Sequence, residues 1–473
     1  MKNLKPLYIP LLSALLFSCT STYEFDEELQ KKHTPTQWSS DLLTTNIKEN
    51  WFEQLKNEQV HQLVTLALTN NFQLKQQALA IEIQQQQLTI AGSVLWPSLD
   101  MSLKGSRQKT VVDNNTANYG NNASLGLNLQ YELDLWGKLS DAERQANLEL
   151  MAQQATFEQA KHQLVADVIK AWFSVIEANQ LVELYQQRTH NTQQNLLIIE
   201  SGYQQGLNSA LDVYLTRNEV NTELSRTTDQ QAKKILAIRQ LERLLGQYPD
   251  GKLFVEAELP LLGSEIPLGL PTDLVSRKPE LLASWYQLLA KDSALAYAHK
   301  QRFPSVSITA SLNDDQQDIS DLLSASSLGW SLLGSVVMPL FNAGKLEANE
   351  EKSRLVLKQT EQSYLSTLYD AFADVENSVT FEESLKERYQ MMIKAQENAI
   401  AAETLSFEQY QSGLVEYTTV LDAQSRSYDA QSTVIEIKSQ LIANRINLHI
   451  ALGGNFASSS SVTNTATIEQ GEG

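Results

Sequence analysis

The residue types that perform most enzyme chemistry are present in this 473-residue sequence, but they do not form a recognisable site. Metal sites need ligands at short, regular spacings, and none of the six histidines has such a partner. The glycines of "ALGGN" end a helical stretch and do not open a phosphate-binding loop. The adjacent Met391-Met392 is better explained by packing than by copper binding. We therefore predict no enzymatic activity, no metal site and no cofactor. The histidines are His33, His61, His162, His190, His299 and His449.

Cys19 is the only cysteine, and it ends a stretch with the features of a secretory leader. In "MKNLKPLYIPLLSALLFSC", two lysines precede an apolar run, and a small residue stands before the cysteine. Leu16-Phe17-Ser18-Cys19 resembles the lipobox of bacterial lipoproteins. That resemblance implies a signal peptide at 1–18 and a covalent lipid on Cys19, and Thr20 favours the outer membrane. The alternative is an ordinary leader that ends near a buried cysteine.

The composition excludes some classes of partner. The formal charge is −19, so the chain would repel the phosphates of nucleic acid, and we predict no nucleic-acid binding. After the first twenty positions no apolar run is long enough for a transmembrane helix. A membrane role must therefore come through strands or through a lipid.

The two halves of the sequence align without a gap at an offset of 207 residues. Self-similarity of this kind identifies a duplicated structural unit. The matched landmarks are Trp96-Pro97-Ser98 with Phe303-Pro304-Ser305, Gly137-Lys138-Leu139 with Gly344-Lys345-Leu346, Gly206-Leu207 with Gly413-Leu414, and Leu245-Gly246 with Leu452-Gly453. We predict an extended N-terminal segment at 19–57, a first repeat at 58–246, a linker at 247–271, a second repeat at 272–453 and a disordered tail at 454–473.

Each repeat contains runs without glycine or proline that predict very long helices. We expect helical hairpins at 138–245 and 345–452, turning at Gly206 and Gly413, each preceded in its repeat by a helix. Those preceding helices are expected at Glu58 to Gly92 and at Thr272 to Arg302. At about 1.5 Å per residue the first long helix would span roughly 100 Å and its return helix only about 58 Å. The preceding helix can therefore stack end to end with the return helix, which gives a rod with four helices in cross-section.

Coiled-coil packing along that rod is indicated by apolar residues that step by four and three positions. The residues of this seam are Leu164, Val168, Ala171, Val175, Ala178, Val182 and Tyr185.

Two strand pairs are predicted, at about 97–135 and 304–340, from the alternation of apolar and polar residues. A half-buried soluble sheet has the same period, but the leader favours a membrane barrel. The polar stretches 107–123 and 313–327 are expected to be extracellular loops. Four strands cannot enclose a barrel, and open sheet edges are not tolerated in hydrocarbon. Three chains that pool twelve strands would solve both problems.

The sequence resembles the TolC-like outer membrane efflux factors, and more closely their lipoprotein branch associated with resistance-nodulation-division pumps. The motifs that carry the resemblance are Trp51-Phe52, "LALTNNFQL" and above all "IPLGLPTDLVSRKPEL" at 266–281. It implies a mixed α and β fold: a trimeric transmembrane β-barrel, with four strands per chain, continuous with a long periplasmic α-helical barrel. It also implies outer-membrane lipid, a periplasmic adaptor and an inner-membrane pump as partners of a homotrimer. The alternatives are a type I secretion exit duct and a structural trimeric coiled-coil surface protein.

The resemblance also implies roles for the two hairpin turns, which in the family dock onto the adaptor. The docking residues carried over to this sequence are Gly206, Leu207, Asn208, Gly413, Leu414 and Val415. A second reading is that each glycine only closes a helix.

A periplasmic gate just beyond the turns is the last implied feature. Asp422 would form a pore-lining ring of carboxylates, and Tyr410 would link to Asp212 between neighbouring coils. Thr419 and Val415 stand where the family pattern has a second aspartate and an arginine, so hydrophobic closure by Leu421 or Val420 could substitute. A further alternative is that Asp422 is an ordinary exposed residue near a helix N-terminus.

Overall fold

The computed structural model describes residues 28–39, 57–112, 116–255, 258–260, 269–322 and 327–454. The predicted signal peptide, Cys19, Trp51-Phe52 and nearly all of the tail lie outside these residues. Two compact units are present. The first takes Ala80–Gln154 and Ala283–Ser366 with the described part of Met1–His33, and the second takes the rest.

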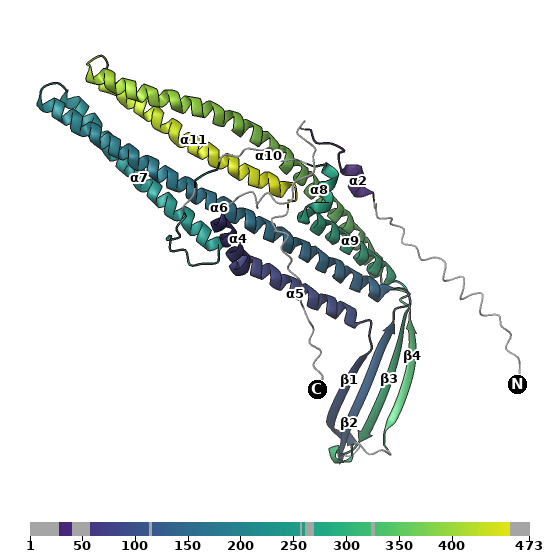
Figure 1. The fold of residues 1–473 in the computed structure, drawn as a ribbon. Coiled ribbons are helices and arrows are strands. Elements are labelled where there is room, and N and C mark those ends of the chain that lie inside the picture. Colours follow the sequence, from purple (N-terminus) through teal and green to yellow (C-terminus); the bar gives the residue numbers. More distant parts are fainter. Residues whose placement is uncertain are drawn as a thin grey trace. The chain divides into compact units, whose positions relative to one another are not determined.

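The duplication is visible as two runs of elements in the same order (Figure 1). A short helix, α2 (Leu29–His33), precedes them. The first run is α4 (Glu58–Asn70), α5 (Phe72–Ser93), β1 (Ser98–Val112), β2 (Thr116–Leu133), α6 (Lys138–Gln204) and α7 (Ala210–Leu244). The second is α8 (Pro271–Arg277), α9 (Pro279–Lys300), β3 (Ser305–Gln316), β4 (Gly329–Val337), α10 (Lys345–Gln411) and α11 (Tyr417–Ala451), with a 3-10 turn η2 (Ile319–Asp321) between the strands. None of the described helices is long and apolar enough to cross a membrane.

The helix that opens each repeat was predicted as one continuous element, and this is wrong in both repeats. Asn71 separates α4 from α5 because its side chain caps α5, accepting the Leu74 N–H at 3.0 Å, and donates to the Leu244 carbonyl at 2.9 Å. Lys278 separates α8 from α9 because the residue before a proline is disfavoured in helical conformation. These two breaks occupy equivalent positions in the duplication.

The four strands form one antiparallel sheet in the order β1-β2-β3-β4. Leu129 stands opposite Leu99 of β1 and Ala310 of β3, which sets the register across the inner strands. Large apolar side chains remain exposed on both edge strands, as the predicted alternation requires. They include Leu99, Met101 and Leu103 on β1, and Trp330, Leu332 and Val336 on β4.

The polar stretch 107–123 was predicted as a loop, and most of it is strand. β1 continues to Val112 and β2 begins at Thr116, with Arg107 opposite Asn121 in the ladder. The side chains of Arg107 and Lys109 lie over the Tyr119 ring, at 5.4 and 5.8 Å from its centroid. A backbone ladder needs no apolar side chains, so the polarity of this stretch was a poor guide. The loop prediction for 313–327 is wrong for 313–316, which continue β3, and the described residues 317–322 and 327 lie outside the strands.

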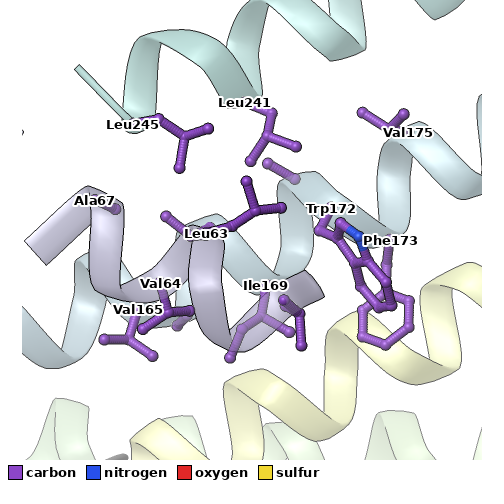
Figure 2. Packing of buried hydrophobic residues seen from close by; sticks show 14 of the residues in the cluster. Leu63, Val64, Ala67, Val165, Ile169, Trp172, Phe173, Val175, Leu241 and Leu245 are labelled. Atoms are coloured by element: carbon purple, nitrogen blue, oxygen red, sulfur yellow. The ribbon is translucent and has the colours of Figure 1, made fainter. Parts of the chain in front are cut away.

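The second unit contains the main apolar core, where α4, α6, α7 and α11 pack together (Figure 2). Leu63 and Val64 of α4 lie beside Ile169 of α6, and Leu241 of α7 lies close to them. The predicted seam is confirmed at its centre, since Val168 and Val175 are fully buried. The remaining members of the core include Val60, Ala67, Val165, Trp172, Phe173, Leu245, Ile442 and Ile446.

Gly246, just after α7, has a positive φ of 71° and no room for a side chain. A Cβ there would lie 2.5 Å from the Asn70 carbonyl oxygen, whereas a Cβ on Gly206, with φ of 73°, would meet nothing within 4 Å. We expect Gly246→Ala to lower the free energy of unfolding by about 3 kcal/mol, from strain and overpacking together. Gly206→Ala should cost about 1 kcal/mol, from the backbone alone. Equal shifts in the thermal unfolding midpoints of the two variants would contradict this.

Candidate functional site at the hairpin turns

Each long helix reverses direction through a turn of the same geometry. At the first tip turn, Gly206–Asn208, the Leu207 N–H donates to the Gly202 carbonyl at 2.8 Å. At the second tip turn, Gly413–Val415, the Leu414 N–H donates to the Gln409 carbonyl at 2.9 Å. Both glycines have positive φ, as this way of closing a helix requires. Figure 1 shows the two turns at the same end of the second unit.

The leucine after each glycine projects into solvent. Leu207 is 76% exposed and Leu414 is 74% exposed, although both are large and apolar. Asn208 instead folds back, and its amide donates to the Ile199 carbonyl at 3.1 Å. Val415 is half-buried. Each tip turn therefore presents one leucine on a backbone closed by a hydrogen bond, which suits contact with an apolar surface on a partner.

The helices that leave the two turns begin differently. In α7 the Ser209 hydroxyl accepts the Asp212 N–H, and the Asp212 carboxylate accepts the Ser209 N–H, both at 3.1 Å. This reciprocal capping box satisfies two backbone donors at the helix start. The residue equivalent to Asp212 at the start of α11 is Thr419, which is exposed, and the N-cap residue Glu416 makes no side-chain capping bond. Only the first repeat thus has a carboxylate at the position of Asp212.

Tyr410 of α10 and Asp212 of α7 are brought together, as the predicted link requires. The Tyr410 hydroxyl donates to Asp212 Oδ2 at 3.3 Å, so one carboxylate caps its own helix and holds the second hairpin. Burial and the Asp212 carboxylate raise the pKa of Tyr410 to about 12. The hydroxyl therefore remains a hydrogen-bond donor at neutral pH.

An apolar tip cluster lies below this link. It consists of Ile199, Val213, Tyr417 and Val420, and the Tyr417 ring lies 5.1 Å from the Tyr410 ring. Because Val420 is fully buried in the cluster, it is not available to close a channel, as the sequence had suggested it could. Leu421 is half-buried and packs against the same cluster. Sequence reasoning had assigned no role to Tyr417.

Asp422 lies apart from the link and faces solvent. It accepts a hydrogen bond from Arg426 Nε at 2.9 Å, and both side chains are well exposed. Arg426 had not been considered, although a basic residue four positions after an acidic one on a helix signals such a pair. The carboxylate expected to line the pore thus has a cation beside it within the same chain.

Among the described residues, no three His, Cys, Asp or Glu side chains lie close enough together to hold a metal ion. What the turns do contain is an exposed leucine on each turn and a side-chain hydrogen bond that joins α10 to α7.

The model of the "Outer membrane efflux protein" family matches twice, at residues 63–247 and 270–454. The chain is 26% identical over 437 residues to "Toluene efflux pump outer membrane protein TtgF" of Pseudomonas putida, covering 92% of this chain and 90% of that protein. It is 27% identical over 416 residues to "Cation efflux system protein CusC" of Escherichia coli, covering 85% and 88%.

A solved structure with the same fold is the CmeC outer membrane channel of Campylobacter jejuni. The TM-score is 0.82 with 22% identity, covering 94% of each chain. The predicted fold class is confirmed by such neighbours and by the four-stranded sheet with its long helices. The two matched ranges of the family model together span most of the sequence. The chain belongs to the outer membrane efflux protein family.

Proposed function

We propose that this chain is the outer-membrane channel of a three-part efflux system. It is a passive exit duct that carries substrates from a periplasmic adaptor and an inner-membrane pump, of the resistance-nodulation-division type, to the outside. The observation that carries the proposal is the combination, in one chain of this family, of a lipid-compatible sheet with helical hairpins that end in exposed leucines.

The edges of the sheet support assembly into a homotrimer. β1 and β4 are the edge strands, and each pairs on one side only within the described sheet. An unpaired strand edge is not tolerated in hydrocarbon, because its backbone groups find no hydrogen-bond partners there. Neighbouring copies would supply the missing strands, and three copies would close a barrel of twelve.

Deletion of the gene in its native host tests the function. We expect the deletion strain to accumulate a fluorescent dye such as ethidium, and re-expression of this chain to restore its loss from the cells. A type I secretion duct would instead leave dye accumulation unchanged and remove a protein from the culture medium. A surface stalk would change neither, so an unaffected strain would contradict both transport functions.

The lipid on Cys19 is proposed to be a secondary anchor. Exposed apolar side chains of the strands already offer a surface to the bilayer, and one lipid chain gives only marginal, reversible membrane binding. We expect a Cys19→Ser variant, given a cleavable leader, to reach the outer membrane as a trimer. Fractionation followed by electrophoresis without heating measures this. Recovery of the variant only as a soluble periplasmic monomer would overturn the prediction.

A further inference from the structure

Arg188 of α6 is buried in the second unit, although a charged side chain in a long helix ordinarily faces solvent. Its side chain is 2% exposed, and its Nη2 lies 3.2 Å from the Glu223 carboxylate of α7, which is fully buried. Arg226, one turn further along α7, contributes a second cation to the same carboxylate at 2.6 Å. Removing two charges from water is expensive, so this pair requires a reason beyond stability.

Two tyrosine rings enclose the Arg188 guanidinium. Its central carbon lies 4.3 Å from the centroid of Tyr185, on the same helix, and 4.1 Å from that of Tyr428, on α11. A desolvated cation between two aromatic faces is among the stronger cation–π arrangements. Tyr428 belongs to the second hairpin, whereas Arg188 and Glu223 belong to the first. The stack therefore joins the two hairpins within one chain.

A comparison of the two repeats shows that the residues of this stack are not duplicated. In the second repeat the positions of Arg188 and Glu223 hold Ala395 and Ala430, and in the first repeat the position of Tyr428 holds Asn221. The other hairpin thus has two small residues at the same level, and its own buried ion pair, Arg445 with Glu382 at 2.7 Å, lies elsewhere along its helices. An ion pair at this particular level is therefore not needed to form such a hairpin.

The surroundings of the stack are polar on every packed element. Thr192 of α6 and Ser427 of α11 are fully buried, and Thr189 and Thr227 share a hydrogen bond of 2.8 Å between α6 and α7. Burial raises the pKa of Glu403 on α10, a carboxyl group that also interacts with Arg188. A polar band thus separates the tip cluster from the apolar core, and contacts across it depend on geometry more than on apolar area.

We propose that Arg188 and Tyr428 form an interhairpin clasp, which holds α11 against α6 and α7 and sets the resting position of the second hairpin. The clasp differs in chemistry from the Tyr410–Asp212 link near the turns. The link uses a phenol hydroxyl, whereas the clasp uses an aromatic face. The Tyr428 hydroxyl is buried near Thr192 and Glu403, and no described residue is placed to form a hydrogen bond of good geometry with it. Tyr428→Phe keeps the ring that stacks on Arg188, so it should leave the clasp intact.

Hydrogen exchange of the purified full-length protein tests the clasp without reference to transport. Tyr428→Leu should accelerate amide exchange in α11 near Tyr428 by about 5- to 30-fold, the loss expected for one desolvated cation–π contact. Tyr428→Phe should exchange as the parent does. Arg188→Lys, which keeps the charge and loses the planar group, should accelerate exchange as Tyr428→Leu does. Arg217→Lys, in an exposed ion pair with Glu200, is the matched control and should have no effect.

A double-mutant comparison separates the clasp from simple loss of apolar contact. In an Arg188→Met/Glu223→Gln background, which removes both buried charges together, Tyr428→Leu and Tyr428→Phe should differ by less than about twofold. The proposal is overturned if they differ there as much as in the parent, or if Tyr428→Phe alone accelerates exchange. An effect of Tyr428→Leu on channel conductance rests on the proposed function, so unchanged conductance with altered exchange would show that the clasp does not control the channel and would leave the clasp itself standing.

Discussion

Replacing both Leu207 and Leu414 with aspartate should abolish efflux while the yield of trimer stays at the parent level. Both side chains are about three-quarters exposed, and both turns are closed by backbone hydrogen bonds that do not involve them. The fold therefore loses little when they change. An apolar contact with the adaptor would lose two buried leucines per chain and gain two desolvated charges, each of which is costly.

The control places the same charges at the neighbouring positions. Gln205 and Ser412 are equivalent in the duplication, exposed, and next to the turn glycines. Gln205→Asp with Ser412→Asp should keep most of the efflux activity, because it leaves the leucines in place. The measurement is ethidium efflux from a deletion strain that carries each variant. If the leucine variant transports normally, the tip turns do not dock through these side chains. If both variants fail alike, charge at the turns and not leucine contact is responsible.

Much of the fold could be predicted because it depends on local and repeated signals. The turns at Gly206 and Gly413 were found since a helix that closes through a positive φ needs glycine there, and both residues have it. The offset of 207 residues then transferred each assignment from one repeat to the other. The ends of α6 and α10 followed from the same signals.

What could not be predicted depends on contacts between distant residues. Asn71 breaks the first helix by donating a hydrogen bond to the Leu244 carbonyl, which lies 173 positions away. No pattern in the neighbouring sequence predicts that bond. The long β1 and β2 were missed because a backbone ladder is indifferent to polar side chains. Arg188 and Glu223 were missed because charged residues in a long helix normally face solvent.

At the candidate site, too, some contacts could be predicted from the sequence and others were missed. The pairing of Tyr410 with Asp212 was expected only through a resemblance, and the structure confirms that the two side chains meet. Their role in gating stays a prediction. Arg426 beside Asp422 was readable from the four-residue spacing but was not considered. It changes what the carboxylate can do, because a ring of Asp422 side chains would be partly neutralised by its own helix.

The open fraction of the channel should therefore change when the Tyr410–Asp212 link is removed, but not when Asp422 is replaced. Tyr410→Phe removes the hydroxyl that reaches Asp212 and keeps the ring that packs on Tyr417. A hydrogen bond to a charged group is worth roughly 1.5–3 kcal/mol, so we expect the open fraction in planar bilayers to rise about tenfold or more. Asp212→Ala should do at least the same, because it also removes the capping box of α7.

The dependence of conductance on alkaline pH tests the Tyr410–Asp212 link independently. The pKa of Tyr410 is raised to about 12, above its ordinary value of 10.0, so the protonated phenol is the favoured form in the folded state. The stabilisation is fully present below the ordinary value and is lost as the pH rises through about 12. Conductance of the parent should thus be constant across neutral pH and rise only in that alkaline range, and Tyr410→Phe should lose that rise.

Ion selectivity should depend on Asp422 and should not depend on the Tyr410–Asp212 link. Three symmetry copies of a carboxylate around a narrow axis attract cations, and Arg426 opposes them. Asp422→Asn should weaken cation selectivity, whereas Arg426→Gln should strengthen it, and neither should change the open fraction as Tyr410→Phe does. Reversal potentials in asymmetric salt measure the first effect, and single-channel recordings measure the second. If Asp422→Asn and Arg426→Gln shift the reversal potential in the same direction, or not at all, the carboxylate does not line the pore. If Tyr410→Phe also leaves conductance unchanged, closure must depend on the half-buried Leu421 or on residues away from the turns.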